Sequence, residues 1–308
     1  MSENLAIGES GASRNKVVPA ALSIETCQTS QRVEAVFRYG AHYESSSRYG
    51  DPAFQIDLYQ RNAMVTGFAL EHVVEQFPPI DSLVCVEGVV IRVDTTVQLW
   101  VQSLASIAVL GPEHCVFNLA LPHWVVDKTV VDRACALWAT LPDEDRRFVN
   151  EVFIDPVILR GFLSAPGSCN HHHAHDGGCI EHSVETAEIA SAMAAQSPEL
   201  DRDLLVTIAL VHDSGKALEY ERSRGGRWSM SRCGRQIGHK ISGIRLASLA
   251  MSNCPHMSPG RKESLLHMLS CSYGPAWAGL RAPRIREAHV FSAIDRLSAE
   301  AGVRTGRC

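Results

Sequence analysis

The sequence predicts an α+β protein with two domains, a small β-barrel followed by an all-α helical bundle. Short segments with alternating apolar residues fill the chain from residue 31 to residue 122. From residue 123 to residue 308, apolar residues instead recur at three- and four-residue spacing. Strand signals in one part of a chain and helical signals in the rest are typical of separate domains. Residues 1–30 are small and polar, and we expect them to form a flexible tail.

The composition is that of a globular chain. Of the 308 residues, 45% are hydrophobic and 20% are charged, which excludes a mostly disordered protein. The net charge of −5 excludes a coat protein that binds nucleic acid through overall basicity. No apolar run is long enough to cross a bilayer, and the first residues lack the pattern of a secretory signal. The ten cysteines are scattered without a CxxC motif. We therefore expect a cytoplasmic protein with reduced thiols and no membrane partner.

Five segments of the first part carry strand signals. In the second of them, Phe54, Ile56 and Leu58 alternate with polar residues. The expected strands are 33–39, 53–59, 64–70, 82–93 and 96–107. Five short strands so close together fit a small barrel better than an open sheet, with a less specific β-rich interaction domain as the alternative.

The second part carries helical signals. The expected helices are 130–141, 144–153, 180–196, 203–212, 237–252, 261–269 and 286–301. The first two carry apolar residues at three- and four-residue spacing, and the fourth, 203–212, is an apolar helix. No strand signal of comparable strength interrupts them.

Histidines are concentrated in the helical part. Ten of the fourteen lie between His171 and His289, and five of these lie between His171 and His182. Neutral imidazole is the commonest metal ligand in proteins near neutral pH, so this clustering indicates metal or phosphate chemistry. A bare run of histidines also occurs on solvent-exposed surfaces. Here, however, the run precedes a turn at Gly177 and Gly178 and then a helix that contains His182.

A second apolar helix ends in His212 and Asp213. Each of these two residues could simply cap a helix, His212 at a carboxyl end and Asp213 at the next amino end. A buried imidazole beside a buried carboxylate is costly, however, and a divalent cation bound by both would remove that cost. Asp295 lies on the apolar flank of a later helix. The sequence therefore predicts that His182, His212, Asp213 and Asp295 bind one divalent cation.

This pattern, H…HD…D, resembles that of the HD superfamily of metal-dependent phosphohydrolases. It is closer still to the YhaM-type 3′–5′ exoribonucleases, which carry the motifs HHAY-x-GGLLEH, HDxGK and I-G-H. The corresponding segments here are residues 172–182, 212–216 and 237–239. The resemblance covers residues 30–300. It implies an OB-like nucleic-acid-binding domain at residues 31–122 and an HD-type metal-dependent phosphohydrolase domain at residues 123–308.

One motif departs from the pattern of this family. Where the YhaM-type proteins carry SHHG, residues 270–274 are SCSYG, so those histidines are missing here. If they help to bind a second metal ion or the substrate, both a two-metal mechanism and full nuclease activity are in question. His267 lies about one helical turn earlier and is a candidate substitute.

The resemblance implies chemistry at a divalent metal ion, with Mn, Fe, Mg and Zn all open. Mixed imidazole and carboxylate donors suit Mn or Fe better than a thiolate-type zinc site. The ion would lower the pKa of a bound water and polarise a phosphoryl oxygen. We expect Lys216 to stabilise the charge that develops on the phosphate. The histidines expected to contact phosphate oxygens, or to act as general acid to the leaving group, are His172, His173 and His239.

A basic segment follows the second motif. Residues 222–262 contain nine lysines and arginines and no acidic residue. The segment is either a solvated loop or, beside a phosphoesterase site, a phosphate-binding channel, and we expect the channel. The side chains expected to bind nucleic acid are Arg222, Arg224, Arg227, Arg232, Arg235 and Lys240. Candidates for stacking on bases are Trp228 and Tyr220 here, and Tyr39, Phe54 and Trp100 in the barrel unless these three form its core.

These observations favour a metal-dependent phosphodiesterase acting on single-stranded RNA or DNA, in the first place a 3′–5′ exoribonuclease. Three alternatives stay open. They are an HD phosphohydrolase of small nucleotides, an HD-type relaxase-like protein of a conjugative element, and a nucleic-acid-binding relative without turnover. The preceding barrel argues against the relaxase, whereas the altered residues 270–274 motivate the non-catalytic alternative.

Overall fold

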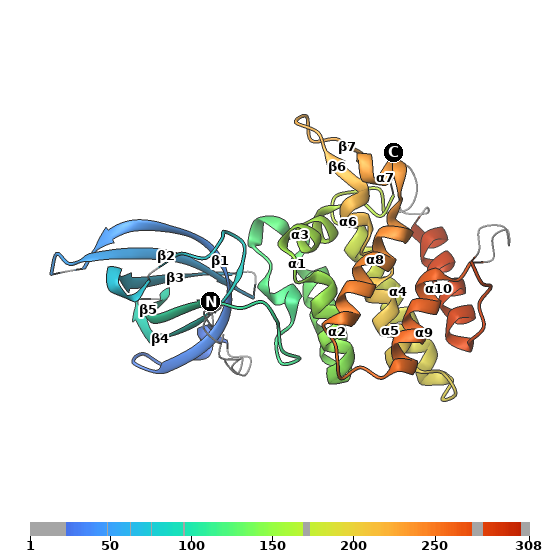
Figure 1. Ribbon diagram of the computed structural model, residues 1–308, viewed down its shortest axis with the longest axis horizontal. Coiled ribbons are helices and arrows are strands. Elements are labelled where there is room, and N and C mark those ends of the chain that lie inside the picture. Colours follow the sequence, from blue (N-terminus) through green and yellow to red (C-terminus); the bar gives the residue numbers. More distant parts are fainter. Residues whose placement is uncertain are drawn as a thin grey trace, which may run out of the picture.

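The computed structural model describes residues 23–302, apart from residues 48, 62, 75, 95, 169–172 and 273–279. A closed barrel of five strands and a region of helices lie next to each other along the long axis of the molecule (Figure 1). The α+β architecture predicted from the sequence is therefore confirmed. Within the described residues, no helix is long and apolar enough to cross a membrane.

The barrel has a simple closed topology. Its strands are β1 (Arg32–Ser46), β2 (Pro52–Gln60), β3 (Ala63–Leu70), β4 (Leu83–Val93) and β5 (Thr96–Ser106). They close in the order β1-β2-β3-β5-β4, with β1 antiparallel to both β2 and β4 and with β3 parallel to β5. This is the closure of an OB-type barrel. Each expected strand is present, since alternation of apolar residues is a local property of the chain.

Strand β1 continues beyond its predicted end at Tyr39, because a bend lets its second half pair with another strand. Its first half pairs with β4 and its second half with β2, and the register shifts between Tyr39 and His42. A bulge of this kind turns a strand sharply, so one strand can pair on both sides of the closure. Gly40 lies in the bend, where a Cβ atom would lie 2.4 Å from the ring of Tyr59.

The barrel core corrects one expectation and decides between two alternatives. Ile24, in the short 3-10 helix η1 (Ile24–Thr26), is fully buried there beside Cys27. The predicted tail therefore ends before residue 30, because burial of these two apolar side chains stabilises their segment against the barrel. Residues 1–22 lie outside the described residues. Tyr39 is also fully buried, so of its two alternatives it takes the place in the barrel core, and Phe54 packs against the same core.

Arg38 joins the barrel to the helical part. Its Nε donates to the carbonyl of Leu119 at 2.5 Å, and its guanidinium lies 5.2 Å from the ring centre of Trp124. These partners lie in η3 (Val116–Leu119) and η4 (Pro122–Trp124), whose apolar side chains belong to the helical core. The domain boundary predicted after residue 122 therefore falls inside a segment that packs with the helices.

One further 3-10 helix, η2 (Glu71–Val73), belongs to the barrel part.

The helical part is built mainly from helices of nine residues or more. Its helices are α1 (Lys128–Ala139), α2 (Asp143–Phe153), α3 (Pro156–Ser164), α4 (Gly178–Gln196), α5 (Arg202–Val211), α6 (Lys216–Glu219), α7 (Arg232–Gln236), α8 (His239–Ser252), α9 (Pro259–Ser270) and α10 (Arg286–Gly302). A hairpin of β6 (Tyr220–Arg222) and β7 (Trp228–Met230) projects from them (Figure 1). The sequence does not predict this hairpin, α3, α6 or α7, since short elements carry little periodicity.

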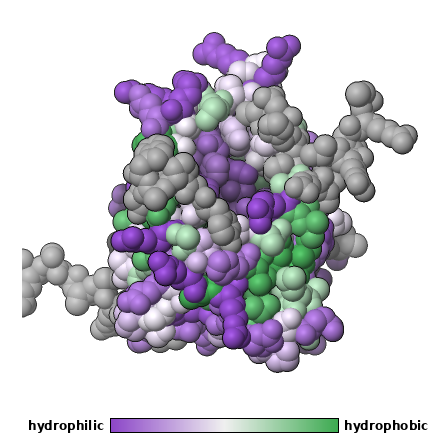
Figure 2. Space-filling model, turned by 90° about the vertical axis from the view of Figure 1, so that its right-hand side faces the viewer, coloured by the Kyte–Doolittle hydropathy of each residue, from purple (hydrophilic) through white to green (hydrophobic). Residues whose placement is uncertain are grey.

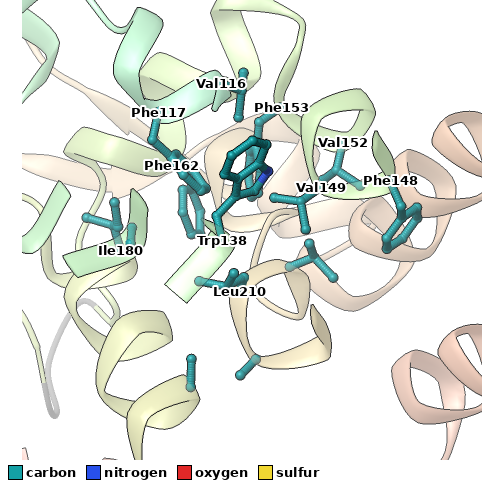
Figure 3. Close-up of a cluster of buried hydrophobic side chains, with 14 of the residues drawn as sticks. Val116, Phe117, Trp138, Phe148, Val149, Val152, Phe153, Phe162, Ile180 and Leu210 are labelled. Atoms are coloured by element: carbon teal, nitrogen blue, oxygen red, sulfur yellow. The ribbon is translucent and has the colours of Figure 1, made fainter. Parts of the chain in front are cut away.

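Large apolar side chains from several helices form one core (Figure 3). The rings of Phe153 and Phe162 lie 4.5 Å apart, and Phe117 lies 5.4 Å from Phe153. Helix α5 is buried along its length from Leu204 to Val211. Because interiors are close-packed, this burial holds the carboxyl end of α5 in one place, and His212 and Asp213 follow directly after it.

Candidate metal centre

The four predicted metal ligands converge inside the helical part. His182 comes from α4, His212 and Asp213 follow α5, and Asp295 comes from α10. His182 Nε2 lies 3.0 Å from Asp295 Oδ1 and 3.8 Å from Asp213 Oδ2. His212 Nε2 lies 3.4 Å from Asp213 Oδ2 and 3.7 Å from Asp295 Oδ1. The two imidazole nitrogens and the Asp213 oxygen all lie within 4.8 Å of one another, and Asp295 lies next to the two imidazoles but outside this group of three.

Hydrogen bonds on the far side of each imidazole turn its Nε2 toward the two carboxylates. His212 Nδ1 lies 2.9 Å from the carbonyl of Ala209, so it donates there as the helix ends. His182 Nδ1 lies 3.0 Å from Ser298 Oγ. His212 does cap its helix, as the alternative interpretation held, but the cap uses only Nδ1 and leaves Nε2 for the centre. Histidines that bind metals are commonly held by their other ring nitrogen in this way.

Close backbone packing brings α8 to the same place. A Cβ atom on Gly215 would lie 2.0 Å from the carbonyl oxygen of His239, so only glycine permits this approach of α6 to α8. As a result, His239 Nε2 lies 3.8 Å from Asp213 Oδ1. Its Nδ1 lies 2.9 Å from Oε2 of the buried Glu219, which fixes the ring.

The charges of the centre are strongly coupled. Burial by itself would raise the pKa of Asp213, but the neighbouring His212 and Lys216 hold that pKa well below its usual value. Burial by itself would lower the pKa of His212, but the carboxylates of Asp213 and Asp295 outweigh it and raise that pKa. The pKa of Asp295 is lowered, because the hydrogen bond with His182 and the charge on His212 outweigh burial.

The donor set fits a divalent cation. His182, His212 and Asp213 each offer a ligand atom, and these atoms lie within 4.8 Å of one another. His212 Nε2 is buried without a hydrogen-bond partner among the described residues, an arrangement that a bound cation would satisfy. Imidazole with carboxylate is a common donor set for divalent transition metals.

The sequence assigns Lys216 to the substrate phosphate, whereas the structure pairs it with Asp213. Its side chain is only 9% exposed, and Nζ lies 2.6 Å from Asp213 Oδ2. Burial by itself would lower the pKa of this lysine, but Asp213 raises it above the usual value, so the side chain stays charged. Lys216 therefore holds the Asp213 carboxylate.

His172 and His173 are expected to contact phosphate oxygens, and the structure describes only His173. His173 is buried, and its ring centre lies 5.5 Å from that of His182. Its nitrogens face acidic side chains, with Nε2 3.2 Å from Glu185 and Nδ1 3.5 Å from Glu181. The sequence predicts that His173 contacts phosphate, whereas in the structure its ring faces two carboxylates. His172 lies outside the described residues.

The six cationic side chains expected to bind nucleic acid are all exposed. Arg222 and Trp228 also hold the β6–β7 hairpin in place, since Arg222 lies 2.8 Å from Asp176 Oδ2 and Trp228 Nε1 donates to Asp176 Oδ1 at 2.6 Å. The guanidinium of Arg235 donates to the carbonyl of Met230. The hairpin projects at the top of the molecule, where Figure 2 shows hydrophilic side chains.

Residues 271 and 272, part of the altered motif, line a cavity of about 290 Å³ beside the centre. Asp295, Lys240 and Arg296 line it as well. His267, the candidate substitute for the missing histidines, accepts a hydrogen bond at Nε2 from the backbone N–H of Arg284 at 3.0 Å, so this nitrogen is not available to an ion. Tyr273 and Gly274 lie outside the described residues.

Sequence reasoning missed four polar residues that support the site: Glu181, Glu185, Glu219 and Ser298. A spacing signal was present for each of them. Glu219 and Ser298 lie three residues after Lys216 and Asp295, and Glu181 and Glu185 are four residues apart on the helix of His182. Such spacings place side chains on one helical face. Only the fold shows that these faces meet.

Residues 179–300 match the family model described as HD domain, and all four predicted ligands lie in that range. The helical part of this chain contains an HD domain. The 3′–5′ exoribonuclease YhaM of Geobacillus sp. is 28% identical over 142 residues, which are 45% of this chain and 42% of that protein. Proteins of the same name from Bacillus velezensis and Bacillus subtilis are 30% identical over 142 residues, 45% of this chain and 44% of theirs. The matched part spans less than half the length of these curated relatives.

Two solved structures are similar to the chain at low scores. The second OB-fold domain of replication protein A from Methanococcus maripaludis has a TM-score of 0.25 and 14% identity, covering 28% of this chain and 94% of that chain. Aspartyl tRNA synthetase from Entamoeba histolytica has a TM-score of 0.31 and 11% identity, covering 86% of this chain and 62% of that chain. Scores this low carry no argument about function.

Proposed function

We propose that this protein is a metal-dependent phosphodiesterase that shortens single-stranded nucleic acid from its 3′ end, with RNA as the substrate. The observation that carries the proposal is the convergence of His182, His212, Asp213 and Asp295 within an HD domain. The names of the curated relatives support the substrate class. An OB-type barrel in the same chain also supports it, because such barrels serve as platforms for single strands.

The four converging residues would hold the ion, and mixed nitrogen and oxygen donors favour Mn or Fe. A bound ion would supply a water of lowered pKa and would polarise a phosphoryl oxygen. His212 and Lys216 keep Asp213 ionised, and Lys216 holds its carboxylate in place for this role. His239 reaches the centre with Nε2 and is oriented by Glu219, so we assign to it the proton transfer to the leaving oxygen.

The substrate strand would approach across the cavity that Asp295 lines. Lys240 and Arg296 line the same cavity and provide positive charge for a phosphate next to the centre. The exposed arginines of the β6–β7 hairpin would contact the strand further out. With serine and cysteine where related proteins carry histidines, we infer that the centre holds one ion.

The decisive experiment measures the degradation of 5′-labelled RNA and single-stranded DNA of graded lengths, and of mononucleotides, by the full chain with added Mn²⁺. We expect a ladder that shortens from the 3′ end, and we expect Asp213→Asn to reduce the rate at least about 100-fold, since a ligand of the ion is lost. Asp203→Asn, at the other end of α5, is the matched control and should retain full activity. Equal rates in the wild type and Asp213→Asn would refute the catalytic assignment.

The same assay separates the alternatives. Rates that fall with increasing length, and that are highest on mononucleotides, would replace this proposal with a phosphohydrolase of small nucleotides. Binding of single strands without any ladder would identify a binding protein instead. Site-specific nicking of supercoiled plasmid would identify a relaxase-like protein.

A further inference from the structure

We propose that His173, His175 and Glu181 form a second metal site, separate from the HD centre, which binds a divalent cation of the Zn²⁺ type. Their ligand atoms lie within 4.8 Å of one another. His175 Nε2 lies 2.9 Å from Glu181 Oε2, and His173 Nδ1 lies 3.5 Å from the same oxygen. Two imidazoles and one carboxylate are a donor set that binds Zn²⁺ and leaves one coordination position open.

The surroundings of His173 are those of a metal ligand. Its Nδ1 faces the proposed ion, and its Nε2 lies 3.2 Å from Glu185 Oε2 on the other side. A carboxylate beside the second ring nitrogen is the usual support of a zinc-binding histidine. The side chain is 6% exposed, so the ring has one fixed position.

The backbone is shaped to hold this ring. His173 has a φ of 50°, in the left-handed region that residues other than glycine rarely adopt. A Cβ atom on Gly178 would lie 2.0 Å from the carbonyl oxygen of His173, so the segment packs directly on the start of α4. Strained backbone of this kind gathers at binding sites. Here it points His173 at two acids of one helix face, Glu181 and Glu185.

The site is open to solvent on one side. His175 and Glu181 line a cavity of about 390 Å³, together with Asp127 and Asp176. The side chain of His175 is 58% exposed, so a cation can enter without a change in the fold. The lining holds three carboxylates, Asp127, Asp176 and Glu181, against one lysine, Lys128, and this balance favours a cation over an anionic ligand. The open coordination position would face this cavity.

A chain of polar groups links the two centres. Glu185 Oε2 accepts a hydrogen bond from Ser298 Oγ at 3.3 Å, and Ser298 Oγ lies 3.0 Å from His182 Nδ1. His173 contacts Glu185 at one end of this chain, and His182 faces the HD centre at the other. Through these contacts, an ion bound to His173 would affect the orientation of the His182 ring. The proposal does not depend on which reaction the HD centre catalyses.

The test measures bound metal in the full chain. The chain is stripped with a chelator and titrated with Zn²⁺ against a chromophoric competitor, and bound zinc is counted by mass spectrometry. We expect two equivalents for the wild type and one each for Glu181→Gln and Asp295→Asn. The double variant should bind none. Glu188→Gln, also on α4 but paired with Arg133, is the matched control and should bind two.

Several results would overturn the proposal. A run of histidines alone would bind zinc without Glu181, so retention of two equivalents by Glu181→Gln assigns the second ion elsewhere. One equivalent in the wild type, lost in Asp295→Asn, shows that the cluster is only a network of ion pairs. If Glu181→Gln fails to fold by circular dichroism, the exposed His175→Ala replaces it with the same expectation. Glu185→Gln should weaken the second equivalent about 10- to 100-fold, as loss of a supporting carboxylate does.

Discussion

Replacing Lys216 by methionine tests the central ion pair of the HD centre. The lysine and Asp213 side chains are 9% and 6% exposed, and their charged atoms lie 2.6 Å apart. Removing one partner of a buried pair costs about 3–5 kcal/mol, because the other charge stays buried. Since His182 and His212 also face Asp213, we expect Lys216→Met to lower the free energy of unfolding by about 3 kcal/mol, the lower end of that range.

The assay is urea unfolding in chelator, followed by circular dichroism, for Lys216→Met, Asp213→Asn and the double variant. The double variant leaves neither charge unpaired, so its loss should be smaller than the sum of the two single losses by at least about 1 kcal/mol. Arg202→Met is the control, because its pair with Asp203 is 33% and 40% exposed and should contribute less than about 1 kcal/mol. Additive losses within about 0.3 kcal/mol would refute the buried pair.

Three further predictions follow from neighbouring contacts. Ser298→Ala removes the support of a ligand histidine, so Mn²⁺ binding at the HD centre should weaken about 10-fold or more in a calorimetric titration, and unchanged affinity would contradict the assigned orientation. Gly215→Ala places a methyl group 2.0 Å from the carbonyl of His239, so it should destabilise the fold by about 1–3 kcal/mol in urea unfolding, whereas Gly225→Ala, in an open part of the hairpin, should not. Replacing Arg224 by alanine should reduce the salt dependence of single-stranded RNA binding, measured by fluorescence anisotropy, by about 0.7 in log–log slope, and an unchanged slope would exclude this arginine from the strand path.

Much of the fold could be predicted from the sequence, because its signals are local. Alternation along residues 53–59 defines a strand whatever it packs against, and three- and four-residue spacing does the same for α2. The bend in β1 carries no such signal, since it arises from pairing with β2 and β4 at once. The burial of Ile24 likewise depends on a barrel that forms later in the chain.

The candidate site divides in the same way. Residue type and spacing selected His182, His212, Asp213 and Asp295 as candidates, because metal ligands belong to a small set of side chains. The tertiary structure alone decided which way the remaining groups face. It turned Lys216 to Asp213 and His173 to Glu185, and it brought Ser298 behind His182. Orientation depends on contacts between helices that are distant in sequence, and local periodicity carries no information about those contacts.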